Sequence, residues 1–300
     1  MLYVQPDFYD DFHCIADRCR HSCCLGWEID IDPDSMERYT SVGGELGEYL
    51  GENISPDPSP HFILGEGERC PMLRSDGLCR MIIELGEDSL CDICTEHPRF
   101  YNEYHGRLES GLGLCCEEVC RLLCEGNEPL GFEIYDDGED EEAEVPELIT
   151  LREKIFGFLA DDGITMTLRM EKALALFGAE PVKFDAKKTA CFYKSLERLD
   201  ESWTELLEQM ERCGGDIELE PRLSDIRYER IAAYFIYRHF AAAQSTEEAV
   251  LKLKFAFLST MIVCCMDISS PDVEALRLYS AEIEYSDENT DKILDWISGQ

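Results

Sequence analysis

Sixteen cysteines constrain this 300-residue chain more than any other feature, because they are unevenly placed. Twelve lie within residues 1–124, and the remaining 176 residues hold only Cys191, Cys213, Cys264 and Cys265. Cysteines at this density are joined as disulfides, bind a metal ion or stay as buried thiols. The sequence therefore predicts a cysteine-rich domain, rather than a chain that is cysteine-rich throughout.

The compartment decides between disulfides and metal ligands, so the first residues are informative. They read Met1-Leu-Tyr-Val-Gln-Pro-Asp7, with neither a basic start nor an apolar core, which is unlike a secretory signal. The longest apolar stretch, residues 255–266, is shorter than a bilayer span and contains a serine and a threonine. We therefore expect a cytoplasmic protein with reduced cysteines, no membrane anchor and no membrane partner.

The charge excludes one class of partner and divides the chain. With 64 acidic and 27 basic residues the net charge is −37, which repels nucleic-acid phosphates, so we expect no nucleic-acid partner. Residues 125–150 hold 11 acidic residues and no base, and such a block cannot bury itself. We therefore expect a cysteine-rich domain at 1–124, an acidic linker at 125–150 and a second domain at 151–300.

The expected fold is mainly α, with a small loop-rich, metal-binding cysteine domain that has short strands, followed by an α-helical bundle. In the first domain, alternating apolar residues predict strands at 27–31 and 108–114, Asp32-Pro33 predicts a helix start, and residues 117–124 predict a short helix. In the second domain we expect helices at 150–158, 165–177, 191–210, 228–243, 247–266 and 290–296, with no parallel sheet. The pattern at 191–210 is that of one continuous apolar helix face.

The early cysteines occur in close pairs that suit a metal site. Their order is Cys14, Cys19, Cys23, Cys24, Cys70, Cys79, Cys91, Cys94, Cys115, Cys116, Cys120 and Cys124. Two thiolates from one tight loop and two from elsewhere satisfy zinc or an iron–sulfur cluster. The spacing favours a metal, and it leaves structural zinc, buried free thiols and a redox or catalytic cluster all open.

Four motifs in this region also resemble a known family. They are Cys19-x3-Cys23-Cys24-x-Gly26-Trp27, Cys70-Pro71-x-Leu73-x3-Gly77-Leu78-Cys79, Leu90-Cys91-x2-Cys94-x2-His97-Pro98-Arg99 and Cys116-x-Glu118-x2-Arg121. In this order they resemble the flagellin lysine-N-methylases of the FliB type, and part of the pattern is similar to a wider group of zinc- or iron-chelating proteins. The late motif departs from the family, with Cys115 and Glu117 where Ser and Pro are usual.

The resemblance implies an enzyme of the bacterial flagellum system. Its expected activity is methyl transfer from S-adenosylmethionine to lysine ε-amino groups of flagellin, the protein partner. It implies an iron–sulfur cluster, of the 4Fe-4S type, with zinc as the alternative. The implied metal ligands are Cys19, Cys23, Cys24, Cys70, Cys79, Cys91, Cys94 and Cys116.

Methyl transfer sets its own requirement, because an ε-ammonium with a pKa of about 10.4 must lose a proton before it can attack. Candidate catalytic residues beside the cysteine motif are His97, Tyr101 and Tyr104. Arg99 and Arg121 are candidate cofactor-binding residues for the carboxylate of S-adenosylmethionine, or they neutralise thiolates. No glycine-rich strand-to-helix loop marks the cofactor pocket.

A different class of function competes with the enzyme. The alternative is a non-catalytic metal-binding or electron-transfer module, with zinc or an iron–sulfur cluster, whose helical domain docks a protein partner. The high acidity favours a lysine-bearing partner under either hypothesis, although solubility alone also explains it.

Overall fold

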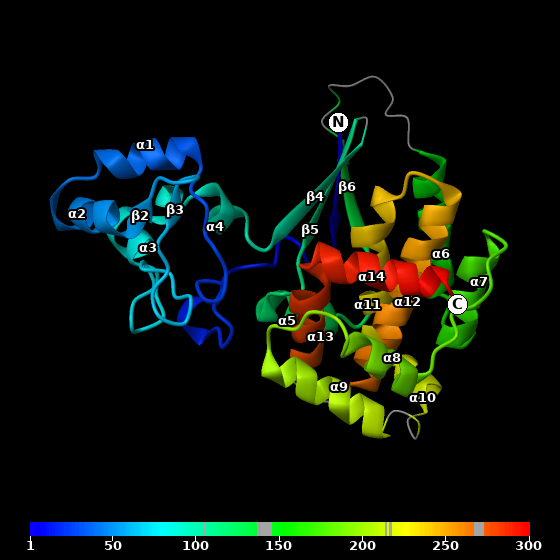
Figure 1. The fold of residues 1–300 in the computed structure, drawn as a ribbon. Helices are drawn as coiled ribbons and strands as arrows, with labels where there is room; N and C mark the ends of the chain where they lie inside the picture. The colour runs from blue at the N-terminus through cyan, green and yellow to red at the C-terminus, as the bar shows by residue number, and fades with distance from the viewer. Residues whose placement is uncertain (105, 137, 139–145, 214, 216–217, 267–272) are drawn as a thin grey trace. The chain divides into compact units, whose positions relative to one another are not determined.

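The computed structural model describes residues 1–104, 106–136, 138, 146–213, 215, 218–266 and 273–300. Within them the chain forms two compact units, which Figure 1 shows as ribbons. The cysteine unit comprises His13–Arg99, and the helical unit comprises Met1–Phe12 together with Phe100–Gln300. The division therefore falls at His13 and Arg99, and not in the acidic segment 125–150 where the charge pattern predicted it.

The cysteine unit is built from short elements around a small core. In chain order they are η1 (Ala16–Arg18), α1 (Pro33–Ser41), α2 (Gly44–Asn53), β2 (Ile54–Ser55), β3 (His61–Phe62), α3 (Arg80–Leu85), η2 (Glu87–Ser89) and α4 (Asp92–Glu96). The most deeply buried core residues, each 1% exposed, are Ile29, Leu50, Met72, Met81 and Cys91. Much of the unit is loop, as the sequence predicted.

Local sequence signals explain one boundary in this unit and mislead at another. Asp32 caps α1 by accepting a hydrogen bond from the backbone N of Ser35 at 2.8 Å, and Pro33 occupies the first helical turn, as expected. The predicted strand at residues 27–31 is wrong. Only isolated bridges form in and beside this segment, Asp30 with His61 and Leu25 with Arg69.

A four-stranded sheet explains why the N-terminus belongs to the helical unit. The strands are β1 (Leu2–Pro6), β4 (Arg99–Tyr104), β5 (Arg107–Leu112) and β6 (Phe132–Asp136), in the order β4-β5-β1-β6. Strand β1 runs parallel to β5, with Tyr3 opposite Leu108, and antiparallel to β6, with Val4 opposite Ile134. Strand β6 lies inside the predicted linker, so residues 132–136 are part of the fold. Residues 137 and 139–145 of this segment lie outside the described residues.

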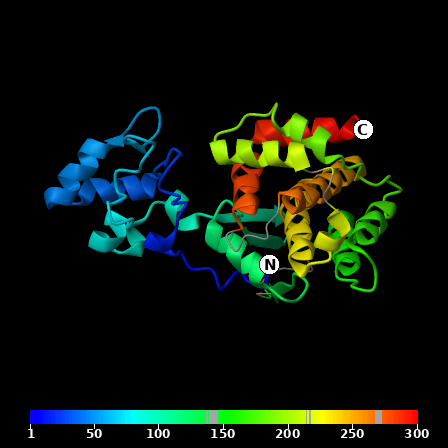
Figure 2. The same ribbon diagram turned by 90° about the horizontal axis from the view of Figure 1, so that it is seen from below.

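Helices make up the rest of the helical unit and confirm the mainly α class. They are α5 (Glu117–Glu125), α6 (Glu147–Leu159), α7 (Met166–Ala175), α8 (Ala186–Tyr193), α9 (Glu201–Cys213), α10 (Leu219–Leu223), α11 (Ile226–His239), η4 (Phe240–Ala242), α12 (Thr246–Cys265), α13 (Glu274–Tyr279), the π-helical turn Ser280–Glu284 and α14 (Asp287–Ser298). Helices α11 and α12 lie side by side at the centre of the core (Figures 1 and 2). Their nearly uniform apolar sequence predicted this position.

Three predicted helices differ from the observed ones. The single helix expected at 191–210 is two helices, α8 and α9, and Leu199 in the break between them is 82% exposed. Helix α6 starts before Thr150, with Pro146 at its N-cap. Helix α14 starts before Thr290, where Ser286 caps it through the backbone N of Asn289. For α6 and α14 a residue outside the apolar pattern, Pro146 or Ser286, therefore marks the start.

In the part of the chain that the structure describes, no helix combines the length and the apolar character needed to cross a bilayer.

Candidate functional site

The loops of the cysteine unit bring together thiols that lie far apart in the sequence. Cys79 is the N-cap of α3, Cys91 is the N-cap of α4, and Cys94 follows one turn later, with its backbone N bonded to the carbonyl of Cys91 at 3.0 Å. Cys70 is joined to Cys24 by a backbone hydrogen bond of 2.9 Å from its N to the Cys24 carbonyl. Short helices and loop-to-loop bonds therefore fix the positions of these residues.

Several of these thiols shift one another's pKa. A hydrogen bond with Cys23 lowers the pKa of Cys24 to about 7, against the effect of burial, and the nearby charge of Arg69 lowers it further. Burial raises the pKa of Cys70 to about 12, and the charges of Cys24 and Cys79 add to this. Burial also raises the pKa of Cys79, where Cys24 and Cys91 contribute.

The Cys-x-x-Cys pair on α4 joins the same group. A hydrogen bond with Cys94 lowers the pKa of Cys91 to about 7. The same bond raises the pKa of Cys94, and burial and the charges of Cys91, Cys24 and Cys70 raise it further. We call the resulting group the thiol cluster, which consists of Cys23, Cys24, Cys70, Cys79, Cys91 and Cys94.

The donor set of the thiol cluster fits a thiolate-ligated metal. Six thiols exceed the four that a zinc ion or an iron–sulfur cluster needs, and the lowered pKa values of Cys24 and Cys91 favour the thiolate that binds metal. Among the described residues no cysteine is in a disulfide. Their positions do not form a metal site in this structure, since no three His, Cys, Asp or Glu residues in the described ranges are arranged to hold a metal ion.

The other two predicted ligands, Cys19 and Cys116, lie in different units. Cys19 follows η1 in the cysteine unit and is half-buried. Cys116 belongs to the helical unit, where it is the N-cap of α5. Its thiol neighbours there include Cys115 and Cys120, and burial raises the pKa of Cys120 well above its usual value. Seven of the eight predicted ligands therefore share one unit, and Cys116 is in the other.

The predicted catalytic residues are also divided between the units. His97 is the C-cap of α4, one turn beyond Cys94, and its ring centroid lies 5.6 Å from that of Trp27. Burial lowers the pKa of His97, so its imidazole stays neutral to lower pH than usual. Tyr101 lies on β4 in the helical unit and is 47% exposed. Tyr104 ends β4, and its side chain lies outside the described residues.

The two predicted cofactor-binding arginines have different surroundings. Arg121 is held by two carboxylates of its own helix, Glu118 at 2.6 Å and Glu125. Its hydrogen bonds with Glu118 and Glu125 raise its pKa above the usual range. Arg99 donates from Nη1 to the carbonyl of Thr95 at 3.2 Å, at the end of the cysteine unit. Arg121 is therefore already paired with carboxylates of α5.

The structure adds residues to the site that the sequence motifs did not identify. Tyr39 of α1 lies near Cys91 and Cys94, and its hydroxyl donates to the carbonyl of Ser89 at 2.8 Å. Burial, with those two thiols, raises the pKa of Tyr39. Arg69 provides a positive charge beside Cys24 while its Nη2 donates to the carbonyls of Leu73 and Arg74. In the sequence, Tyr39 is recognisable only as part of the apolar pattern of α1 and not as a residue near the thiols.

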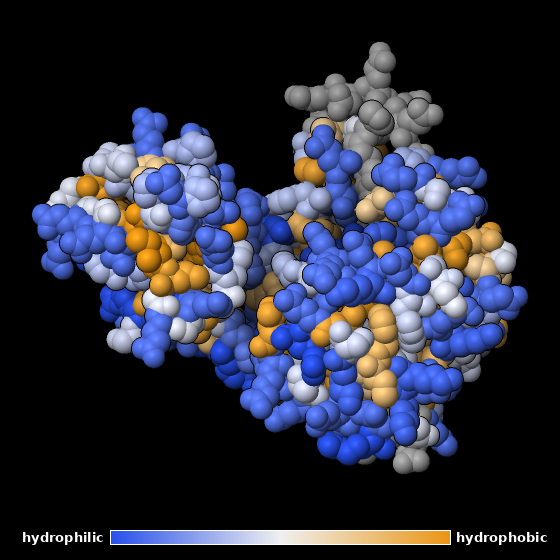
Figure 3. All heavy atoms as spheres, viewed as in Figure 1, coloured by the Kyte–Doolittle hydropathy of each residue, from blue (hydrophilic) through white to orange (hydrophobic). Residues whose placement is uncertain are grey.

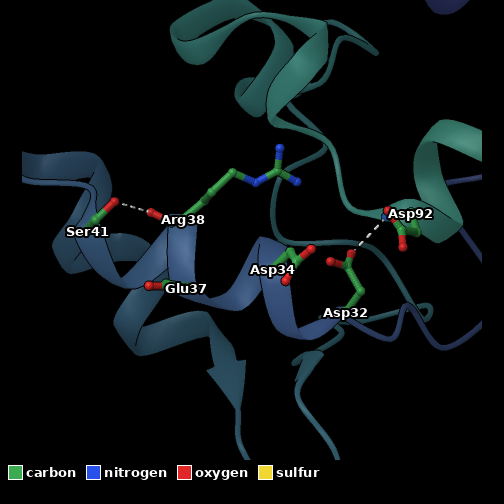
Figure 4. Close-up of a pocket in the computed structure, with 6 residues that line it drawn as sticks. All are labelled: Asp32, Asp34, Glu37, Arg38, Ser41 and Asp92. Carbon is green, nitrogen blue, oxygen red and sulfur yellow. Dashed lines mark hydrogen bonds between the residues drawn. The ribbon is translucent and has the colours of Figure 1, made fainter.

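An open, acidic pocket lies beside the Cys91 segment (Figure 4). It is lined by Asp32, Asp34, Glu37, Arg38, Ser41 and Asp92. Asp32 is already used by the fold, since it accepts hydrogen bonds from the backbone N of Ser35 and from that of Asp92 at 2.9 Å. Burial opposes ionisation of Asp32, but these donors outweigh it and lower its pKa to about 2. The hydrogen bond from Asp92 to Asp32 therefore anchors α4, and with it the Cys91–Cys94 pair, to the start of α1.

Together the fold and these residues define a mainly α protein with a thiol-rich unit. Comparison with known proteins identifies its relatives. The flagellar biosynthetic protein FliU of Salmonella muenchen is 30% identical over 123 residues, which cover 39% of this chain and 73% of FliU. The chain therefore belongs to the family of FliU and the FliB-type lysine-N-methylases, which its motifs resemble.

Two further relatives are both named lysine-N-methylase. They come from Salmonella choleraesuis and Salmonella typhimurium, and each is 29% identical to this chain over 130 residues. The matched part covers 39% of this chain but only 31% of each lysine-N-methylase. No family model matches the chain, and no solved structure is significantly similar to it.

Proposed function

We propose that the protein is an S-adenosylmethionine-dependent lysine N-methyltransferase that acts on ε-amino groups of flagellin. The observation that carries the proposal is the thiol cluster in a chain whose relatives are named lysine-N-methylase and flagellar biosynthetic protein. The names supply the reaction and the flagellar setting, and the cluster supplies a candidate site. Because thiols stay reduced in the cytoplasm, we place the reaction there.

We propose the thiol cluster as the holder of an iron–sulfur cluster of the 4Fe-4S type, with zinc as the alternative. Cys24, Cys79, Cys91 and Cys94 come from three separate loops and helix caps, which allows ligands to approach a metal from several sides. Bound there, the group would supply a Lewis-acidic centre for the cofactor's amino and carboxylate groups. Arg69 beside Cys24 would offset part of the negative charge that the thiolates introduce.

We propose His97 as the group that removes the proton from the substrate lysine. Its position one turn beyond Cys94 places it next to the thiol cluster, and its lowered pKa keeps the imidazole neutral, the form that accepts a proton. Trp27 packs against the ring and would limit its movement. Arg99, two residues further on, is the candidate partner for the carboxylate of S-adenosylmethionine.

The charge of the chain supports a lysine-bearing substrate. The cysteine unit holds 18 acidic residues, seven arginines and no lysine, a net charge of −11. Such a unit attracts a protein that presents lysines and increases the rate of encounter, an effect that salt weakens. A unit without lysine also offers the enzyme no internal target for methylation.

Anaerobic purification followed by iron and sulfide analysis tests the metal assignment. The proposal predicts about four iron and four sulfide per chain, as in a Cys-ligated cubane. Incubation with S-adenosylmethionine and flagellin, read by intact mass, tests the activity. A colourless zinc protein would overturn the iron–sulfur assignment, and flagellin without added methyl groups would overturn the enzyme.

The second candidate function is a non-catalytic metal-binding or electron-transfer module that docks a protein partner. It is favoured by one observation, that the chain spans 31% of the length of the lysine-N-methylases it matches. A metal-loaded protein that binds flagellin but transfers no methyl group would identify this function.

A further inference from the structure

Helix α3 exposes an apolar face on the surface of the cysteine unit. Of its four apolar residues only Met81 enters the core, at 1% exposed, while Ile82, Ile83 and Leu85 are 37%, 48% and 42% exposed. Figure 3 shows hydrophobic side chains gathered over the part of the unit that carries α3. Three large apolar side chains exposed together on one short helix indicate a surface that a partner covers.

The position of α3 links this face to the candidate site. The helix begins directly after its N-cap Cys79, and the next segment, η2, leads to Cys91. Both cysteines belong to the thiol cluster. A partner bound on α3 would therefore lie next to the segments that carry Cys79 and Cys91 of the proposed reaction centre.

The charges around the face are acidic. The guanidinium of Arg80 is taken up by Glu84, at 2.5 Å, and it stacks on the ring of Tyr49 with its Cζ 4.8 Å from the centroid. Glu87 and Asp88 are exposed beside the apolar residues, and Glu84 is exposed too although it pairs with Arg80. An apolar centre with an acidic rim is complementary to an apolar segment flanked by lysines.

We infer that the exposed face of α3, formed by Ile82, Ile83 and Leu85 with the rim of Glu84, Glu87 and Asp88, docks the protein substrate through an apolar segment flanked by lysines. This inference rests on the proposed methyltransferase function and names how its substrate is recognised. Docking at α3 would position one lysine at the thiol cluster while others contact the rim. The face thus selects which lysines are methylated.

Binding of labelled flagellin to the metal-loaded full chain, followed by fluorescence anisotropy at low and high salt, tests the inference. In the variant Ile82→Ser with Ile83→Ser, we expect the Kd for flagellin to rise about tenfold or more, because the apolar contact is lost while the charge is kept. In Glu84→Gln with Glu87→Gln, we expect slower association and a weaker dependence on salt. Leu199→Ser, at an 82% exposed position of the helical unit, is the matched control and should bind as the native chain does.

Iron content and thermal unfolding of each variant identify any that fails to fold. If the double variant fails to fold, it is replaced by Ile83→Ser alone, at the most exposed of the three positions. We expect the Kd for flagellin to rise in this variant too. Flagellin binding and KM that are unchanged in these variants would overturn the docking surface. So would a native dimer that the apolar variant dissociates, because the occupant would then be a second copy of the chain.

These experiments distinguish a failure of the docking surface from a failure of the proposed methyltransferase function. Native protein that methylates flagellin, with no effect of the α3 variants, overturns the docking surface and leaves the enzyme intact. Native protein that binds flagellin through α3 but transfers no methyl group overturns the enzyme and supports the docking surface.

Discussion

Arg152 and Glu109 form a bidentate ion pair in the interior of the helical unit. Nη1 of Arg152 lies 2.7 Å from Oε2 of Glu109, Nη2 lies 2.5 Å from Oε1, and neither side chain has any exposed surface. Arg107 also donates to Glu109, at 2.6 Å. The pair therefore joins strand β5 to helix α6 within one cooperative unit.

Removal of one partner of this pair should destabilise the protein strongly. Arg152→Met leaves the carboxylate of Glu109 buried with only Arg107, and breaking such a pair costs about 3 to 5 kcal/mol. Urea denaturation followed by circular dichroism measures the loss. The control is Arg74→Met, which removes an exposed pair with Asp76 and should change stability far less. Equal effects of the two variants would contradict the buried role of Arg152.

Glu229 predicts a pH dependence of stability. Burial raises its pKa from 4.5 to about 7, and the hydrogen bond from the backbone N of Leu130 opposes this only in part. Because the folded state holds the proton more tightly, Glu229 favours folding below about pH 4.5, and this contribution is lost as pH rises to about 7. Denaturant unfolding of Glu229→Gln and the native chain, compared over this range, should show the native chain losing stability relative to the variant. A constant difference would contradict the raised pKa.

Serine substitutions should separate the thiol cluster from the other cysteines. Cys79→Ser and Cys94→Ser each remove a proposed ligand, so we expect iron content after anaerobic purification to fall to background. Cys191→Ser is the matched control, since this exposed cysteine of α8 lies in the helical unit, and it should keep the native iron content. Full metal retention in both cluster variants would refute the assignment of these ligands.

His97→Gln should impair methyl transfer without loss of metal. Loss of a positioned base lowers a rate by roughly a hundredfold or more, whereas the iron content and the KM for flagellin should stay near native values. His61→Gln provides the control, because His61 also lies in the cysteine unit but bonds through Nδ1 to the carbonyl of Ser59. An unchanged turnover number for His97→Gln would exclude His97 as the base.

Local signals in the sequence predicted the elements whose boundaries depend on neighbouring residues. Asp32-Pro33 marks the start of α1, and the uniform apolar run at 247–266 marks the buried helix α12. Pairing between distant segments could not be predicted in this way. Strand β1 joins the helical unit only because residues 2–6 pair with strands that begin more than a hundred positions later.

The candidate site, like the fold, was predictable only where residues close together in the sequence define it. Spacing predicted the cysteines of the thiol cluster as candidate ligands, since close pairs at 23–24 and 91–94 need little tertiary information. Cys116 has an equally good motif but lies in the helical unit, because α5 packs against α11. Tyr39 and Arg69 reach the thiols only through the fold, and no spacing rule contains them.

Methyl transfer to lysine is tested most directly by the intact mass of flagellin. Anaerobically purified native protein, S-adenosylmethionine and flagellin are incubated together, with Cys94→Ser as the matched inactive protein. We expect flagellin to gain mass in whole methyl increments with the native protein only, and peptide mapping to place the methyl groups on lysines. Flagellin of unchanged mass after incubation with iron-loaded native protein would contradict methyl transfer.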